Sequence, residues 1–360
     1  MGLLLQNINK IVSQETHLNA INLEFTRGSR NVILGRTLAG KTSLLRIMAG
    51  LDRPTSGRLL LNDRDVTGIS VRKRNVAMVY QQFVNYPSLT IYNNIASPLK
   101  LGGMAKAEID RRVRETASML RIEHLLDRLP AELSGGQQQR TAIARALVKR
   151  TDLLLMDEPL VNLDYKLREE LRVELQAIFK EREAIVVYTT TEPAEALMLG
   201  GNIVVLDEGQ VVQTGPTPDV YHHPATLKVA EVFSDPPINY MEGHVEKDGI
   251  SLIGAIQFSP SGHLSSLDPG DYTFGVRSNH LFLNRQDESD AEIQARVELA
   301  EINGSETFIH ISHENTSLVV QDEGIHPHKI GAQINVFVNP NHLFVYDHAG
   351  QLIASPGKRL

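Results

Sequence analysis

Leu133-Ser134-Gly135-Gly136-Gln137-Gln138-Gln139-Arg140 is the stretch that most narrows the fold of this sequence. It stands between a phosphate-loop pattern at 35–42 and an apolar run at 153–156 that ends in Asp157-Glu158-Pro159. A phosphate loop and an acidic strand end are typical of one kind of domain, in which a mostly parallel sheet binds its ligand at the carboxyl ends of its strands. The three segments together predict an α/β domain built to bind a phosphorylated ligand.

The phosphate loop follows a predicted buried strand at 31–34 and precedes a predicted helix at 41–49. In this setting successive backbone N–H groups turn inward and hold a phosphate at the positive end of the helix. We expect Lys41 to bridge the β- and γ-phosphates of a nucleotide and Thr42 to offer its hydroxyl to Mg²⁺. The nucleotide contacts expected from this segment are Gly35, Arg36, Thr37, Leu38, Ala39, Gly40, Lys41, Thr42 and Ser43.

Two adjacent acids end the apolar run at 153–156. Because the run is predicted to be a strand, the Asp157 carboxylate should emerge at the carboxyl edge of the sheet, where ligands bind in open α/β folds. We expect Asp157 to hold Mg²⁺ through water and Glu158 to polarise the attacking water as a general base. Taken alone, an Asp-Glu pair is more often two solvated acids, and the phosphate loop reverses that interpretation.

The glycine pair in the opening stretch distinguishes among proteins with phosphate loops. Ser134 is a suitable N-cap, and a helix with one apolar face is predicted from 137 to 149. The glycines let a phosphate approach the backbone at the positive end of that helix. A plain glycine-rich helix start is the alternative, but the octet is too specific to favour it. We therefore expect nucleotide contacts from Ser134, Gly135, Gly136 and Gln137.

Length and composition indicate an ordinary soluble protein of two domains. The chain has 360 residues, 42% apolar and 22% charged, with a formal net charge of −7. The negative balance disfavours nucleic acid as a partner, and no apolar run approaches the roughly 18 residues that a membrane span needs. The sequence contains no cysteine, which excludes disulfides, iron–sulfur clusters and thiol catalysis. We expect a cytoplasmic protein that reaches a membrane only through protein partners.

The pattern of predicted elements changes near residue 235. Before it, short β-branched runs alternate with helical patterns, and the basic stretch Arg72-Lys73-Arg74 is expected to form a solvated turn. After it, short alternating runs such as 272–276 and 334–338 are separated by turn residues, which is typical of a small β-barrel. We predict one domain at 1–235 and an all-β domain at 236–360, with Pro236-Pro237 marking the boundary.

With these motifs in place, the chain resembles the ATP-binding subunits of ABC importers, specifically the carbohydrate-uptake group that carries an additional C-terminal barrel. Val79-Tyr80-Gln81 is similar to the family's glutamine loop, the segment 86–95 to its permease-contacting region, and Asn162-Leu163-Asp164 to its D-loop. The resemblance implies an α/β P-loop ABC ATPase domain followed by an all-β, OB-like barrel of the TOBE type. It also implies that ATP and Mg²⁺ are cofactors.

Further roles and partners come from the same resemblance. It makes Gln81 a catalytic residue and, with Thr42 and Asp157, part of the metal site, and it makes Asp164 a nucleotide contact. It implies that two ATP-binding subunits pair head to tail, so that the phosphate loop of one faces the signature octet of the other. It further implies two membrane permease subunits bound through the Gln81–Ile95 region, and no direct contact with the cargo.

Three positions depart from the family pattern. Aligning Glu195-Ala196 places Thr191 where the family has its switch histidine, which positions the catalytic water. Val12 stands where the family stacks an aromatic ring on adenine, and Leu38 where its loop usually has glycine. These departures favour an asymmetric pair, in which a sister subunit supplies an intact site and this chain completes it with its signature octet. The alternative is drift compensated by neighbours, for example His17 reaching the adenine or a phosphate.

A narrower resemblance concerns the cargo. The run Thr190-Thr191-Glu192-Pro193, with Glu195-Ala196-Leu197, is similar to one subunit of bacterial glycerol importers that use two different ATP-binding proteins. The resemblance favours glycerol among small polyols and sugars, and implies a peripheral position on the cytoplasmic face of a bacterial inner membrane. The closest alternative is a homodimeric ATPase of a sugar or glycerol-phosphate importer. A soluble ABC ATPase without a transport role is less favoured, because the sequence shows no coiled-coil insertion, second ATPase domain or basic surface.

Overall fold

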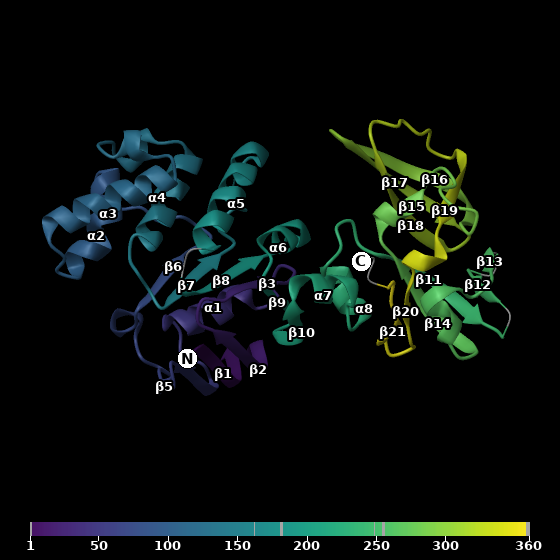
Figure 1. The fold of residues 1–360 in the computed structure, drawn as a ribbon, viewed down its shortest axis with the longest axis horizontal. Coiled ribbons are helices and arrows are strands. Elements are labelled where there is room, and N and C mark those ends of the chain that lie inside the picture. The colour runs from purple at the N-terminus through teal and green to yellow at the C-terminus, as the bar shows by residue number, and fades with distance from the viewer. Residues whose placement is uncertain (1, 162, 181–182, 248, 254–255, 358–360) are drawn as a thin grey trace. The chain divides into compact units, whose positions relative to one another are not determined.

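A computed structural model describes residues 2–161, 163–180, 183–247, 249–253 and 256–357. Its contacts divide the chain into two compact units, Met1–Thr217 and Pro218–Leu360 (Figure 1). This division lies earlier in the chain than the boundary predicted at 235/236. The reason is that α8 (Leu227–Val232) packs its Ala230 against Ile238, Phe344 and Tyr346 of the second unit. Burial of apolar surface thus assigns α7 (Thr217–His222) and α8 mainly to the β-rich part.

The first unit contains a four-stranded antiparallel sheet of order β2-β1-β4-β5. Its strands are β1 (Gly2–Val12), β2 (Glu15–Thr26), β4 (Ser56–Leu61) and β5 (Arg64–Asp65). Alternate residues such as Leu3, Leu5 and Ile8 are buried, which is the pattern of a sheet with one face on the core. The pairing of β1 with β2 is interrupted by register shifts, one of them between Lys10 and Ile11.

The second sheet of this unit has the order β10-β9-β3-β8-β7-β6. Its strands are β3 (Arg30–Leu34), β6 (Val76–Val79), β7 (Leu153–Asp157), β8 (Ile185–Thr190), β9 (Asn202–Asp207) and β10 (Gln210–Pro216). All neighbours run parallel except β10, which pairs antiparallel with β9. The continuous apolar burial of β7 and β8 fits a parallel sheet covered on both faces. The predicted α/β class is therefore confirmed.

Helices cover the parallel sheet on both faces (Figure 1). The α1 helix (Lys41–Ala49) shares one buried core with both sheets through Leu44, Leu45, Ile47 and Met48. On the other face lie α5 (Tyr165–Lys180) and α6 (Pro193–Leu199). A separate helical group contains α2 (Ile91–Leu101), α3 (Lys106–Met119) and α4 (Gly135–Leu147), which contact one another.

The second unit is built from two antiparallel sheets around one core. One sheet has the order β13-β12-β11-β14-β20-β21 and the other β15-β19-β16-β17-β18. Their strands are β11 (Asn239–Val245), β12 (Ile250–Leu252), β13 (Ile256–Phe258), β14 (Gly270–Val276), β15 (Leu281–Phe282), β16 (Ala291–Asn303), β17 (Glu306–His313), β18 (Thr316–Glu323), β19 (Gln333–Val338), β20 (Phe344–Tyr346) and β21 (Leu352–Ala354). The predicted all-β character of this region is confirmed. Across the described ranges, no helix combines the length and apolarity needed to span a membrane.

Arg74 corrects the expectation that 72–74 is a solvated turn, because its side chain is only 8% exposed. The guanidinium donates hydrogen bonds to the carbonyls of Met48 at 2.8 Å, Ile69 at 2.8 Å and Val66 at 2.5 Å. It thereby satisfies a carbonyl at the end of α1 that has no partner within the helix. Burial lowers the pKa of Arg74, and the carbonyl dipoles take the place of a carboxylate partner.

We predict that Arg74→Met lowers the free energy of unfolding by about 3 kcal/mol or more, because three carbonyls lose a charged donor in a buried place. Urea denaturation of the two proteins measures the difference. Arg72→Met is the matched control, since Arg72 is exposed and should tolerate the change. Equal unfolding midpoints for the two variants would contradict this role of Arg74.

Candidate functional site

The phosphate loop connects β3 to α1 and requires glycine at two positions, Gly35 and Gly40. A Cβ on Gly35 would lie 2.3 Å from the carbonyl oxygen of Leu206, which is too close for any side chain. Gly40 has a φ of +101°, and a Cβ there would lie 2.6 Å from the carbonyl oxygen of His17. Backbone from two other strands therefore fixes the loop where its N–H groups begin the helix.

Leu38 adopts the left-handed conformation, with a φ of +69°. A branched apolar side chain is rare there, because Cβ approaches the following carbonyl oxygen, and glycine avoids that contact. The Leu38 side chain is 96% exposed, so no packing offsets the strain. The departure noted in the sequence thus falls at a backbone position that favours glycine. Of the neighbouring residues, Arg36 and Thr37 are exposed and Ala39 is buried.

The Lys41 ammonium group lies at the centre of the site and is 4% exposed. It donates hydrogen bonds to the carbonyl oxygens of Gly35 at 2.7 Å and Arg36 at 2.9 Å. It also forms an ion pair with Glu158 Oε1 at 3.1 Å. Lys41 therefore joins the phosphate loop to the acid that follows β7.

Asp157 ends β7 and accepts two hydroxyl hydrogen bonds on one oxygen. Thr42 Oγ1 is 3.2 Å and Thr189 Oγ1 is 3.0 Å from Asp157 Oδ1. Burial raises the pKa of the Asp157 carboxyl, and the two hydroxyl donors oppose that effect. A hydroxyl and a carboxylate side by side are the oxygen ligands that Mg²⁺ takes in phosphate sites. This donor set fits the metal that the sequence predicted.

Glu158 follows the strand with a φ of +43°, a strained backbone conformation of the kind that gathers at functional sites. Its backbone N–H donates to Thr189 Oγ1 at 3.0 Å, and its carboxylate accepts from Gln81 Nε2 at 3.2 Å. The structure thus brings together Lys41, Thr42, Gln81, Asp157 and Glu158. Sequence reasoning missed Thr189, whose hydroxyl orients both acids, although the threonine run at the end of β8 was a signal.

Thr191 is half-buried just beyond β8. Tyr188 and Thr190, which precede it on β8, donate to Glu195 Oε2 at 3.0 Å and 2.7 Å. Burial raises the pKa of the Glu195 carboxyl. In the part of the chain that the structure describes, no hydrogen bond or ion pair of the Thr191 side chain is found, and its catalytic role stays a prediction.

The signature octet forms the start of α4. Ser134 Oγ accepts from the N–H of Gln137 at 3.4 Å, and Gln137 Oε1 accepts from the N–H of Ser134 at 3.0 Å, which is a capping box. A Cβ on Gly136 would lie 1.9 Å from Leu167 Cδ2, whereas Gly135 faces open space. Ser134 and Gly135 are exposed, and no hydrogen bond joins the octet to the phosphate loop within the described ranges.

Two other predicted contacts lie apart from the lysine cluster. Val12 is 40% exposed next to the β1–β2 turn. Asp164 Oδ1 accepts from the N–H of Leu167 at 3.0 Å, so its carboxylate stabilises the start of α5. Asn162, the first residue of the predicted D-loop, lies outside the described residues.

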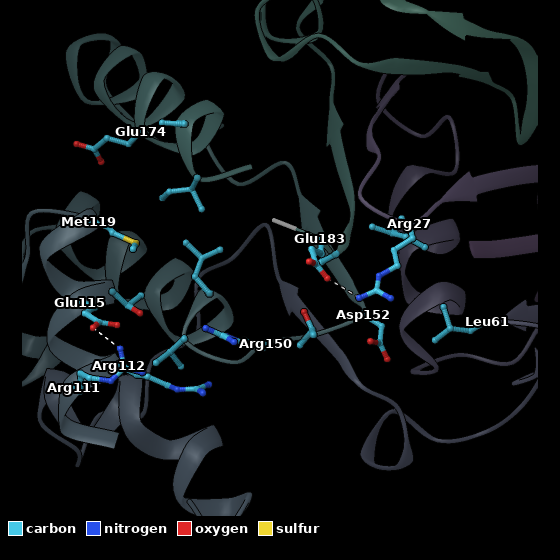
Figure 2. Close-up of a pocket in the computed structure, with 18 of the residues that line it drawn as sticks. Arg27, Leu61, Arg111, Arg112, Glu115, Met119, Arg150, Asp152, Glu174 and Glu183 are labelled. Carbon is cyan, nitrogen blue, oxygen red and sulfur yellow. Dashed lines mark hydrogen bonds and ion pairs between the residues drawn. The ribbon is translucent and has the colours of Figure 1, made fainter. Parts of the chain in front are cut away.

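A cavity of about 870 Å³ lies at the opposite edge of the parallel sheet (Figure 2). Asp152 and Ile185, at the starts of β7 and β8, line it, whereas the acids of the candidate site lie at the strand ends. Figure 2 shows two ion pairs in its walls, Arg111 with Glu115 and Arg27 with Glu183. These charges are satisfied within the chain, and the cavity is not the phosphate site.

The fold and the lysine–acid cluster define a phosphate-loop ATPase domain followed by a β domain, and comparisons with known proteins refine this class. Residues 18–161 match the ABC transporter family model, and residues 274–345 match the TOBE domain model. The trehalose/maltose import ATP-binding protein MalK of Thermococcus litoralis is 34% identical, with 96% of this chain and 97% of that protein covered. The sn-glycerol-3-phosphate import ATP-binding protein UgpC of Psychromonas ingrahamii is 35% identical, with 96% and 93% covered.

Among solved structures, an ATP-binding cassette dimer bound to ADP and phosphate in a post-hydrolysis state is 30% identical. It superposes with a TM-score of 0.55, covering 60% of this chain and 98% of that one. The chain therefore belongs to the family of ATP-binding subunits of ABC transporters. It is an ATPase coupled to transport across a membrane, with an ABC domain that binds ATP and a C-terminal TOBE domain.

The buried Asp157 carboxylate predicts a pH-dependent stability. Because its pKa is raised in the folded state, the group stabilises the fold at low pH, and that stabilisation is lost as pH rises through the folded-state pKa. We predict that Asp157→Asn makes the nucleotide-free protein more stable at pH 7, and that this gain shrinks as pH falls toward the unfolded-state pKa.

Thermal unfolding from pH 4 to pH 8, without nucleotide, measures this effect. Asp127→Asn serves as the control, because Asp127 is exposed and should give the same small change at every pH. A constant difference between Asp157→Asn and the wild type would show that the buried charge does not set the stability.

Proposed function

We propose that this chain is the ATP-hydrolysing subunit of an importer for a small polyol or sugar, with glycerol favoured. The observation that carries the ATPase part is the convergence of Lys41, Thr42, Gln81, Asp157 and Glu158 within hydrogen-bond or ion-pair distance. The import part rests on near full-length similarity, TOBE domain included, to relatives whose names say import. Those names mention trehalose, maltose and sn-glycerol-3-phosphate, so a small hydroxylated solute is the shared class.

Each residue of the cluster has a proposed task. Backbone N–H groups of 36–42 and Lys41 would hold the phosphates. Thr42, Gln81 and Asp157 would hold Mg²⁺, which would supply positive charge against the phosphates. Glu158 is the general base for the attacking water. Its carboxylate pairs with Lys41 Nζ at 3.1 Å and accepts from Gln81 Nε2 at 3.2 Å, which places it beside the groups that would hold the phosphates and the metal.

We further propose that the chain pairs with a second ATP-binding subunit and forms the weaker of two unlike sites. Three departures support this: no histidine at Thr191, no aromatic ring at Val12 and a strained Leu38 without packing. The signature octet retains its capping box and an open Gly135. This chain would then serve the sister subunit's nucleotide with Ser134, Gly135, Gly136 and Gln137. A homodimeric importer ATPase is the competing proposal.

The permease contact is proposed at the Gln81–Ile95 region, and α4 supports this segment. Asn85 Nδ2 donates to the carbonyl of Gln138 at 2.8 Å, and the Arg145 guanidinium lies 5.0 Å from the Tyr86 ring centre while donating to the carbonyl of Val84. Val84 and Tyr86 nevertheless keep 57% and 48% of their surface exposed. Apolar side chains held at a surface by rigid neighbours suit a protein partner. We propose two permease subunits there, a peripheral position on the cytoplasmic face of the membrane, and no contact with cargo or nucleic acid.

The transport proposal predicts that deleting the gene abolishes uptake of one solute among glycerol, glycerol 3-phosphate and maltose, with glycerol expected. Radiolabelled uptake by the deletion strain measures this. Complementation with Ser134→Arg should restore less uptake than Lys41→Ala, since the octet serves the stronger site. Normal uptake of all three solutes would refute the transport proposal, and equal loss in both variants would favour a homodimer.

The asymmetric-site proposal predicts that Thr191→His raises ATP hydrolysis by the purified chain without a sister subunit, by about tenfold or more, because a ring that can position the water is regained. Steady-state phosphate release measures the rate. Thr191→Ala is the control and should leave the low rate unchanged. Brisk hydrolysis by the wild-type chain alone, with no increase on Thr191→His, would contradict the proposal.

A further inference from the structure

The nucleoside end of the site lacks the aromatic ring that position 12 would supply, and the structure offers another ring nearby. His17 lies on β2, and its Nδ1 is 3.1 Å from Ser43 Oγ in the first turn of α1. Its side chain is half-buried, so part of the ring remains accessible. The imidazole thus stands beside the phosphate loop and belongs to the same hairpin as Val12.

A β-bulge in β2 determines the direction of the His17 side chain. In the β1–β2 pairing Lys10 lies opposite Leu18 and Ile11 opposite Thr16, so His17 is the extra residue of the longer strand. A bulge breaks the alternation of side chains and turns the inserted residue away from the regular face, and bulges are frequent next to active sites. Regular alternation along β2 would turn His17 away from α1. The register shift therefore explains why its side chain faces that helix.

The position of His17 is held rigidly against the loop. Its carbonyl oxygen would lie 2.6 Å from a Cβ on Gly40 and 2.7 Å from one on Gly209. The N–H of Asn19 donates to the carbonyl of Gly209 at 2.8 Å, and the N–H of Gly209 donates to the carbonyl of Ala39 at 3.0 Å. The hairpin and the phosphate loop are therefore joined through backbone contacts, so the ring is placed before any ligand binds.

The directions of the Thr42 and Ser43 side chains indicate which part of a nucleotide would lie near the His17 ring. Thr42 points to Asp157, where the acids of the reaction gather. Ser43 is the next residue of the same helix, and successive side chains of a helix diverge by about 100°. Its hydroxyl is directed to the β1–β2 hairpin and away from Asp157. The hairpin side is thus the end remote from the γ-phosphate.

We propose that His17 contacts the nucleoside of ATP and replaces the ring that Val12 does not provide. Ser43 contacts the imidazole through Nδ1, and Val12, 40% exposed, is an accessible apolar side chain on the same hairpin. An accessible planar ring suits a base, because stacking acts without a charged partner. This inference rests on ATP binding by the family and is independent of the importer and its cargo. It would remove Val12 from the departures that support an unlike pair of sites, and it leaves those at Thr191 and Leu38 in place.

The test measures binding, without turnover, of Mg²⁺-ATP and of Mg²⁺-tripolyphosphate to the full chain by titration calorimetry. His17→Asn removes the ring but keeps a polar group toward Ser43, and His17→Ala removes both. Both variants should bind ATP on the order of three- to tenfold more weakly and bind tripolyphosphate as the wild type does. Adding Val12→Tyr to His17→Asn should restore ATP affinity.

Thermal unfolding without nucleotide controls for folding, and the Asn variant keeps the test usable if the Ala variant is unstable. Unchanged ATP affinity in His17→Asn would overturn the proposal. An equal loss of ATP and tripolyphosphate affinity would also overturn it, because His17 would then support the phosphate loop and not the nucleoside.

Discussion

The Asp157 carboxylate at the end of β7 is the constraint on which the site depends. One of its oxygens accepts hydroxyl hydrogen bonds from Thr42 on α1 and Thr189 on β8, which ties a helix and two neighbouring strands to one buried charge. Its burial raises its pKa, so the fold keeps a carboxylate where burial disfavours the charged form. Buried charged groups with shifted pKa values are common at functional sites, where activity is retained at some cost in folding stability.

The strain around this carboxylate is distributed over the residues that would handle a nucleotide. Glu158 and Leu38 both adopt left-handed backbone conformations, one next to Asp157 and the other at the tip of the phosphate loop. Glu158 gains compensation from Lys41, Gln81 and Thr189. Leu38 is exposed and gains none. The same local conformation is thus supported by contacts at the acid and unsupported in the loop.

The acid cluster and the adjoining hairpin are positioned by different physical means. At the acid end, side chains from α1, β7 and β8 converge through charge and hydroxyl hydrogen bonds. At the hairpin end, backbone packing of His17 against Gly40 and Gly209 sets the position, and one side-chain contact to Ser43 orients the ring. In the second unit too, a long-range contact decides the position of an element. The α8 helix belongs to this unit because its apolar surface is buried against Phe344 and Tyr346, which are far away in the sequence.

The sequence by itself determined the class of fold, the order of its motifs and most of the site. Lys41, Thr42, Asp157 and Glu158 follow from local rules, since a strand, a glycine loop and a helix start place them without long-range information. Only the tertiary structure decided the contacts of Thr189, His17 and Arg74. Thr189 and Arg74 act on partners brought near by strand pairing and helix packing, and His17 is aimed by a bulge whose register is a property of two strands together.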